Sequence, residues 1–191
     1  ALLSSGRHSD WFFDIGYAIF EDPRGTEILA EFLIDKLKKE LGDLLLKATR
    51  VVSSAMSAII LGYEIAKKLE IKFAHCDKIG NEQILKRILL KDNEVVLQIE
   101  EIITTLSTTQ KVTNAILRNN PKVKFLQKGG KIIVGTLVYR PPKVEEYSNY
   151  EIITLWQREV QSYPPEECPI CKQGSNAIRF KENREKFYSI T

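Results

Sequence analysis

Two adjacent carboxylates, Glu100 and Glu101, are the residues whose types and spacing most clearly allow chemistry. They follow Val95–Ile99, a nearly continuous apolar run rich in β-branched residues, which is typical of a parallel strand covered on both faces. Open α/β sheets bind ligands outside the carboxyl ends of their strands. We therefore expect the two carboxylates at such an edge, as acceptors for ribose hydroxyl groups or as neighbours of a metal ion.

A run of hydroxylated residues follows the carboxylates and leads into a helix predicted to begin near Thr108. The free N–H groups at a helix start, together with hydroxyl groups, suit a phosphate group. The candidate phosphate-binding residues are Thr104, Thr105, Ser107, Thr108 and Thr109. With the carboxylates, they indicate a phosphorylated sugar as the ligand. The alternative is a strand, a turn and a helix with a capping threonine and two solvated glutamates.

The elements that must position these residues alternate between helical and strand-like patterns. Asp22-Pro23 is typical of a helix start, and apolar residues recur at helical spacing from Ile28 to Leu41, before Gly42. The other predicted elements are strands at 48–52, 71–76, 95–99, 123–126 and 132–139, helices at 56–69 and 108–119, and a turn at Gly129-Gly130. This alternation predicts an α/β fold, with a mostly parallel sheet flanked by helices.

Length and charge limit the classes of protein. A chain of 191 residues with 43% hydrophobic content is enough for one compact domain. Its 28 basic and 25 acidic residues give a net charge of +3, which is too balanced to indicate a nucleic-acid partner. No apolar run approaches the roughly 20 residues that span a bilayer, and no signal peptide is visible. We therefore expect a cytoplasmic protein with no membrane partner.

The cysteines and histidines give no clear site. Cys76, Cys168 and Cys171 do not form a disulfide framework and fit a reducing compartment. Cys168-Pro-Ile-Cys171 is half of a zinc-ribbon pattern, but a structural zinc ion takes four ligands and no second CxxC or CxxH exists. His75-Cys76 completes a site only if the fold brings it close, and His8 has no evident partner. The favoured interpretation is a structural turn with no metal bound; zinc and a redox dithiol are the alternatives.

Four segments in register resemble the type I phosphoribosyltransferase family. VVLQIEEIITTLSTT (95–109) is similar to its phosphoribosyl-pyrophosphate motif of four apolar residues, an acidic pair, two aliphatic residues, Thr-Thr, Gly-Gly and Ser or Thr. Three more resemble one branch, the orotate phosphoribosyltransferases. These are the amino-terminal segment LLSSGRHSDWFFD (2–14), the pyrophosphate loop and helix SSAMSAIILGYEIAKKL (53–69) and the tail YPPEECPICKQG (163–174).

This resemblance implies transfer of a phosphoribosyl group from phosphoribosyl pyrophosphate to orotate, with release of pyrophosphate, in pyrimidine nucleotide biosynthesis. It also implies a homodimer, Mg²⁺ chelated mainly by phosphoribosyl pyrophosphate, and catalysis by positioning and electrostatics. The expected domain is 1–191, with an α/β core at 25–140 and base-side hood and tail segments at 1–24 and 141–191.

The resemblance also assigns roles to individual residues. Glu100 and Glu101 would hold the 2′- and 3′-hydroxyl groups and offset the positive charge of the sugar. Lys78 or Arg87 would meet the departing pyrophosphate, from a segment (77–87) that is a mobile hood loop in the family. Taken alone, that segment is as well explained by a solvated hairpin. Phe12 and Arg140 would face the base, where a forked guanidinium suits the orotate carboxylate.

The sequence departs from the family pattern at the loops that bind phosphate. Leu106 and Ser107 stand where the family has Gly-Gly, and the acidic pair is Glu-Glu instead of Glu-Asp. The pyrophosphate loop, usually Gly-Pro-Ala-x-Gly-Gly, contains no glycine and consists of Ser53, Ser54, Ala55, Met56, Ser57 and Ala58. Two hypotheses follow: a working enzyme, favoured because Thr104-Thr105 and the acidic pair persist, or a non-catalytic homologue that acts as a ligand sensor or subunit partner.

Overall fold

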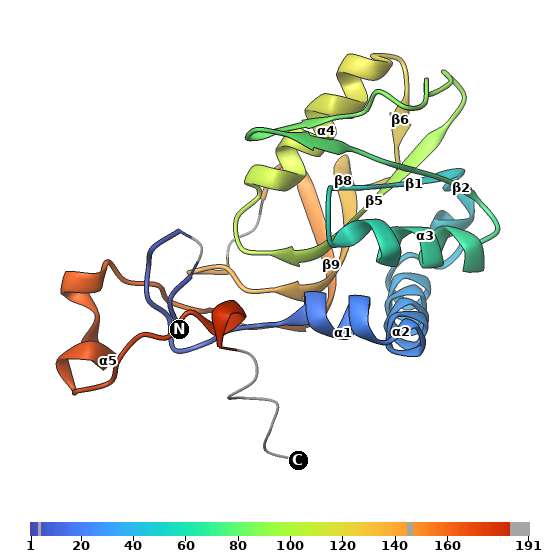
Figure 1. Cartoon of the computed structure of the whole chain (residues 1–191). Helices are drawn as coiled ribbons and strands as arrows, with labels where there is room; N and C mark the ends of the chain where they lie inside the picture. The colour runs from blue at the N-terminus through green and yellow to red at the C-terminus, as the bar shows by residue number, and fades with distance from the viewer. Residues whose placement is uncertain (4, 145–146, 184–191) are drawn as a thin grey trace. The chain divides into compact units, whose positions relative to one another are not determined.

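A mostly parallel sheet of seven strands organises the larger of the two units into which the chain divides. The computed structural model in Figure 1 describes residues 1–3, 5–144 and 147–183. The larger unit contains Ile15–Arg140 and the described part of 145–157. The smaller unit contains Ala1–Asp14, Pro141–Val144 and the described part of 158–191.

The sheet is ordered β2, β1, β5, β8, with β9 beyond β8, and these five strands are parallel. Their bounds are β1 Arg50–Ser53, β2 Lys72–His75, β5 Val95–Ile103, β8 Lys131–Tyr139 and β9 Tyr150–Gln157. The short strand β6 (Lys124–Phe125) pairs parallel with the start of β5, and β7 (Gln127–Lys128) pairs antiparallel with the start of β8. The predicted α/β fold with a mostly parallel sheet is confirmed.

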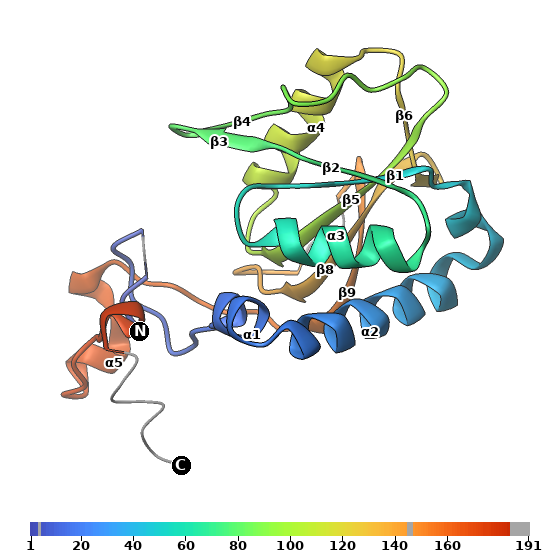
Figure 2. The ribbon, with the colours of Figure 1, turned by 45° about the vertical axis from the view of Figure 1, so that its right-hand side comes forward.

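Helices cover both faces of this sheet. In Figure 2, α2 (Pro23–Leu41) and α3 (Ala58–Lys68) lie on one side and α4 (Ser107–Asn119) lies on the other. The short helices α1 (Ile15–Glu21) and η1 (Gly42–Lys47) flank α2. Gly135 of β8 leaves room for a side chain of the neighbouring strand β5, because a Cβ there would lie 2.8 Å from Ile99 Cδ1. Among the described residues, no helix is long and apolar enough to cross a membrane.

Local chemistry explains where α2 begins and ends. The Asp22 carboxylate accepts a hydrogen bond from the Arg24 N–H at 2.9 Å, and Pro23 occupies the first helical position, where its missing N–H costs nothing. Gly42 ends the helix with φ 52°, a conformation that glycine adopts without strain. Leu33, Leu37 and Leu41 of the predicted apolar face are buried, whereas Ile28 and Phe32, which the same spacing included, are exposed. The sequence analysis predicted this helix correctly.

Three elements differ from the sequence prediction or resolve its alternatives. β5 continues to Ile103, so the prediction that the strand ends at Ile99 is wrong, because β8 pairs with it as far as Tyr139. Residues 77–84 form an antiparallel hairpin of β3 (Asp77–Ile79) and β4 (Glu82–Ile84). The sequence analysis did not predict β9. Its apolar run is interrupted by Glu151 and Thr154, and only its pairing with β8 identifies it as a strand.

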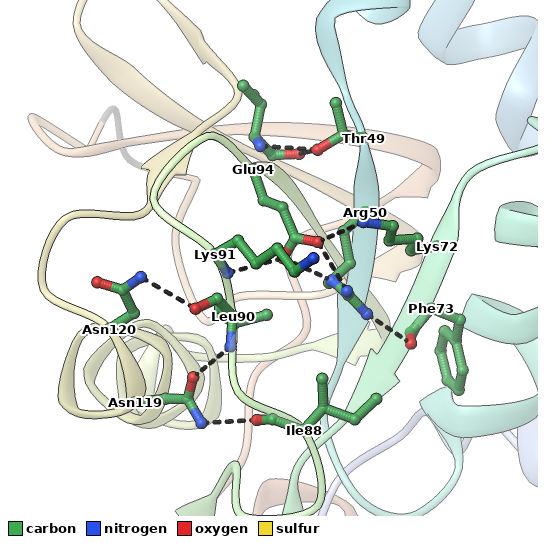
Figure 3. Close-up of polar contacts among 11 residues, drawn as sticks. Thr49, Arg50, Lys72, Phe73, Ile88, Leu90, Lys91, Glu94, Asn119 and Asn120 are labelled. Carbon is green, nitrogen blue, oxygen red and sulfur yellow. Dashed lines mark hydrogen bonds and ion pairs between the residues drawn. The ribbon is translucent and has the colours of Figure 1, made fainter.

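The amino-terminal ends of β1, β2 and β5 share a buried ion pair, shown in Figure 3. Arg50 donates to the two carboxylate oxygens of Glu94 at 3.0 and 2.8 Å, and Lys72 Nζ lies 2.9 Å from the same carboxylate. The pKa of Glu94 is lowered to about 2, chiefly by the hydrogen bonds from Arg50.

The segment before Glu94 is held to the end of α4. The Asn119 and Asn120 side chains form hydrogen bonds with the backbone of Leu90 and Ile88 in that segment. This network stabilises the edge of the sheet that carries no candidate site.

The smaller unit joins the amino-terminal segment to the carboxyl-terminal tail. His8 and Tyr163 exchange two backbone hydrogen bonds of 2.8 Å, Phe12 stacks on Phe180 with 4.7 Å between ring centroids, and Arg158 lies 4.2 Å above the Trp11 ring. Its helical elements are η2 Pro165–Glu167, α5 Pro169–Lys172 and η3 Phe180–Glu182.

Candidate functional site

Glu100 is a buried carboxylate near the carboxyl end of β5. Glu100 is only 4% exposed to solvent. Ser54 Oγ donates a hydrogen bond of 2.5 Å to Glu100 Oε2, whereas Glu100 Oε1 has no hydrogen-bond partner among the described residues. An orphaned buried acceptor of this kind is rare. The structure therefore joins the predicted acidic pair to the predicted pyrophosphate loop through Ser54.

Burial raises the pKa of Glu100 to about 7, an effect that the Ser54 hydrogen bond opposes and the neighbouring Glu101 charge reinforces. Perturbed carboxyl groups of this kind cluster at functional sites. Glu100 and Glu101 lie on β5 itself, not after it, and Glu101 is half-buried. Its carboxylate faces α1, because a Cβ on Gly16 would lie 3.7 Å from Glu101 Oε1.

The predicted pyrophosphate loop connects β1 to α3. Ser53 ends β1 and is fully buried, and its Oγ has no hydrogen-bond partner in the described chain. Met56 is exposed, and the peptide bond between Ala55 and Met56 is cis. Ser57 precedes α3 without capping it by its side chain, and Ala58 is the buried first residue of α3. Ser53 and Ser54 thus lie beside β5 at the carboxyl end of β1, and the other four predicted residues lead from there into α3.

A residue that the sequence analysis missed, Gln83, holds this loop. The Ala55 N–H donates to Gln83 Oε1 at 3.1 Å, and Gln83 Nε2 donates to the Ala55 carbonyl oxygen at 3.2 Å. Gln83 is buried, although it lies in the polar hairpin β3–β4. A buried glutamine inside a polar segment leaves no periodic signal, so the sequence alone could not identify it.

The predicted phosphate loop lies between β5 and α4. Leu106, which replaces a family glycine, has φ −78° and ψ 7° and is buried against Ile103 and Tyr139, among others. Leu106 therefore adopts an ordinary backbone conformation and directs its side chain into the core. Thr104 is half-buried, and Thr105, Ser107 and Thr108 are exposed. Thr109 is buried, and within the described residues its Oγ1 has no partner.

The start of α4 adds backbone donors to these hydroxyl groups. No side chain of the described residues caps this end of the helix, and the first N–H groups of a helix have no partner within it. The combined set of hydroxyl and N–H donors suits a phosphate group. Glu100 Oε1 and the Glu101 carboxylate are oxygen ligands of the kind that Mg²⁺ prefers, so the donor set fits a ribose and a hard cation.

The predicted basic and base-side residues lie on several elements. Lys78 is exposed on β3, and Arg87 forms an ion pair with Asp77, with Nε 3.1 Å from Oδ1. The Arg140 N–H donates to the Ile103 carbonyl oxygen at 2.8 Å, which holds Arg140 at the end of β5, and burial lowers the pKa of its guanidinium. Phe12 belongs to the smaller unit and Arg140 to the larger. The roles predicted for these four residues stay predictions.

Comparison with known proteins identifies relatives by sequence. The chain is 32% identical over 181 residues to an orotate phosphoribosyltransferase of Thermoanaerobacter sp. (strain X514) and 31% identical over 181 residues to that of Caldanaerobacter subterraneus. Each match covers 93% of this chain and 86% of the relative. No family model matches the chain.

Solved structures show the same fold at lower sequence identity. Orotate phosphoribosyltransferase from Aeropyrum pernix matches with a TM-score of 0.57 at 16% identity, covering 82% of this chain and 84% of that one. Adenine phosphoribosyltransferase from Thermoanaerobacter pseudethanolicus matches with a TM-score of 0.57 at 15% identity, covering 77% and 88%. These similarities establish the fold, and the sequence relatives establish the family.

Proposed function

Since the chain belongs to the type I phosphoribosyltransferase family, within its orotate phosphoribosyltransferase branch, we propose that it transfers the phosphoribosyl group of phosphoribosyl pyrophosphate to orotate. Pyrophosphate leaves from C1 of the ribose, and a ring nitrogen of the base forms the new bond to that carbon. The product is orotidine 5′-phosphate.

The observation that carries this proposal is the buried Glu100 carboxylate beside the pyrophosphate loop. One carboxylate oxygen is held by Ser54, and the other is an acceptor with no partner in the described chain. A ribose hydroxyl group that donates to Glu100 Oε1 satisfies it. Negative charge at this point also stabilises the positive charge that develops on the sugar as pyrophosphate leaves.

The two loops bind the phosphate groups in this proposal. Thr109 and the exposed hydroxyl groups of Ser107 and Thr108 surround the uncapped start of α4, which holds the 5′-phosphate. The backbone of the pyrophosphate loop, fixed by Gln83, holds the pyrophosphate. Leu106 is compatible with this arrangement because its side chain points into the core.

We assign Mg²⁺, Lys78 and Arg87 to the departing pyrophosphate. Mg²⁺, bound mainly by phosphoribosyl pyrophosphate, would neutralise the charge of the leaving group. Glu100 and Glu101 supply oxygen atoms suited to a hydrated hard cation. Lys78 is exposed, and Arg87 would exchange its ion pair with Asp77 for a phosphate oxygen. Exposed ion pairs are weak, so this exchange costs little.

Phe12 and Arg140 would contact the base, with the Arg140 guanidinium on the orotate carboxylate. We further propose a cytoplasmic homodimer.

The second candidate function, a non-catalytic ligand sensor or subunit partner, is favoured by one observation. The pyrophosphate loop from Ser53 to Ala58 contains no glycine, and Leu106 and Ser107 occupy the two positions where the family motif has Gly-Gly.

The test combines binding and product formation. Titration calorimetry with phosphoribosyl pyrophosphate and Mg²⁺ measures binding, and chromatography detects nucleotide formed from orotate or from adenine. We expect Mg²⁺-dependent binding and orotidine 5′-phosphate. The variant Glu100→Ala with Glu101→Ala should lose at least tenfold in affinity. The control, Glu27→Gln with Glu31→Gln, removes two exposed carboxylates that pair with Lys68 and should bind normally.

The outcomes separate the hypotheses. Binding without product from either base would support the sensor or partner function. Adenosine 5′-phosphate in place of orotidine 5′-phosphate would assign a different base. Unchanged affinity in the Glu100 and Glu101 double variant would refute the ribose-binding role of the acidic pair.

A further inference from the structure

A cluster of metal-ligating side chains lies in the smaller unit and plays no part in the proposed transferase reaction. His8, Cys168 and Cys171 each offer one ligand atom, and these three atoms all lie within 4.8 Å of one another. His8 Nδ1 is 3.2 Å from Cys171 Sγ. Both cysteines are free thiols. The fold thus supplies the third donor that the sequence alone could not place beside Cys168-Pro-Ile-Cys171.

Backbone hydrogen bonds hold the three ligands in place. His8 is fixed by its paired hydrogen bonds with Tyr163, five residues before Cys168. Cys168 immediately precedes α5, the Lys172 N–H donates to the Cys168 carbonyl oxygen at 3.1 Å, and the Gly174 N–H donates to the Cys171 carbonyl oxygen at 2.9 Å. The ligands therefore come from two distant parts of the sequence that are already joined by backbone hydrogen bonds.

The ligand types and distances suit zinc. Two thiolates and an imidazole are ligands that Zn²⁺ favours, and two thiolates balance its charge. Zn–S bonds of about 2.3 Å and Zn–N bonds of about 2.1 Å place tetrahedral ligand atoms about 3.6–3.8 Å apart. Side-chain adjustments of about 1 Å reach this geometry from the observed cluster. Cys168 is 1% exposed, whereas His8 and Cys171 are half-buried, which leaves the fourth position open to water.

The smaller unit also lacks the apolar core that would hold it together otherwise. Among its described residues, only Val160 and Cys168 are buried hydrophobic residues. Units of this size with little core commonly depend on a bound metal or on disulfides for stability. A metal ion joining His8 to the Cys168–Cys171 turn would supply that link.

We propose that His8, Cys168 and Cys171 bind one Zn²⁺ that fastens the amino-terminal segment to the carboxyl-terminal tail. This departs from the expectation of no bound metal, because His8 supplies a donor from outside the CxxC motif. The proposal does not depend on the transferase function.

Metal content tests the proposal directly. Untagged protein purified without chelators should contain about one zinc per chain by elemental mass spectrometry. His8→Ala, Cys168→Ser and Cys171→Ser should each lower that content at least tenfold. The matched controls His75→Ala and Cys76→Ser remove the other histidine and cysteine and should keep the zinc. His8→Cys, which restores a ligand, should also keep it, so that loss in His8→Ala reports ligation.

A second measurement addresses the structural role. The hydrogen bond from the His8 N–H to Tyr163 should protect that amide from hydrogen exchange, and removal of zinc by a chelator should raise its exchange rate at least tenfold. The proposal fails if the protein contains no zinc and its metal-free form binds no Co²⁺ with a thiolate charge-transfer band. A Cys168–Cys171 disulfide in place of zinc also overturns it. Zinc retained in His8→Ala but lost in the cysteine variants would refute His8 as a ligand.

Discussion

Glu100 shows, at the scale of one residue, how a buried carboxyl group can lower the stability of the folded protein. Its carboxyl group is buried, Ser54 is its one hydrogen-bond donor among the described residues, and its pKa is raised to about 7. In the unfolded chain the group ionises near its ordinary value of 4.5. As pH rises from 4.5 through 7, the folded protein must ionise a group that burial disfavours, so its stability falls. In the proposed function, a ligand hydroxyl group donates to Glu100 Oε1, which has no partner among the described residues.

The first prediction concerns Glu100→Gln. The neutral amide removes the cost of a buried charge, so at pH 8 the free energy of unfolding in urea should rise by about 3 kcal/mol, the difference that the raised pKa represents. At pH 4.5 and below, where Glu100 is protonated, the variant should be no more stable than the original protein. Affinity for phosphoribosyl pyrophosphate should fall at the same time. A variant that is equally stable at pH 8 would contradict the raised pKa of Glu100.

At the scale of elements, the hairpin β3–β4 acts as a support for the pyrophosphate loop. Gln83 forms two hydrogen bonds with the Ala55 backbone. The hairpin is in turn held to α4, where Lys111 Nζ donates to the Asn81 carbonyl oxygen at 2.7 Å and Arg118 donates to the Gln83 carbonyl oxygen at 3.2 Å. The two loops predicted to bind phosphate groups are therefore connected through the hairpin and α4.

The second prediction follows from this connection. Gln83→Ala removes both hydrogen bonds to Ala55 and should lower the free energy of unfolding by about 1–3 kcal/mol. Because the loop loses its support, affinity for phosphoribosyl pyrophosphate should fall more than fivefold, which calorimetry would measure. The control Gln127→Ala, at an exposed position on β7, should change neither quantity. Unchanged affinity in Gln83→Ala would show that the loop holds its conformation without the hairpin.

The sequence predicted most elements of the larger unit, and its failures have physical reasons. Helix α2 and strand β1 followed from apolar periodicity and from capping residues, which are local signals. The extension of β5 to Ile103 and the existence of β9 depend on pairing with β8, which is a long-range property. The same holds for the candidate site. Glu100 was visible from its place after an apolar run, whereas Gln83 and the approach of His8 to Cys171 arise only from the folded chain.

For the whole molecule, the sheet separates a stabilising edge from the edge that carries the candidate site. The amino-terminal strand ends carry the Arg50–Glu94 ion pair, in which both carboxylate oxygens of Glu94 accept hydrogen bonds from Arg50. The carboxyl-terminal ends of β1 and β5 carry Glu100, with an unsatisfied oxygen among the described residues. Two buried glutamates on one sheet thus have pKa values displaced in opposite directions, to about 2 and about 7.

The third prediction concerns acid stability. The lowered pKa of Glu94 means that its stabilising contribution is complete above the ordinary value of 4.5 and is lost as pH falls toward 2. Between those pH values the free energy of unfolding should decrease by about 3 kcal/mol from this group. Glu94→Gln should flatten that decrease, and at pH 7 it should be destabilised by about 3–5 kcal/mol because Arg50 loses its buried partner.

The control for Glu94 is Glu40→Gln, which breaks an exposed ion pair with Lys36 and should change the acid profile little. Urea unfolding followed by circular dichroism at a series of pH values measures both variants. An acid profile of Glu94→Gln that matches the original protein would remove Glu94 as the cause of acid unfolding.

The division into two units has a consequence for the order of folding. The chain passes between the units after residues 14, 140, 144 and 157, so β9 is flanked in sequence on both sides by segments of the smaller unit. In the pairing of β9 with β8, Ile132 lies opposite Tyr150 and Tyr139 lies opposite Gln157. This pairing closes the loop between the two strands, so the segments that follow β8 and β9 have a high effective concentration relative to each other. Once that loop-closure entropy has been lost, the smaller unit assembles at little further entropic cost. We therefore expect completion of the sheet to precede assembly of the smaller unit.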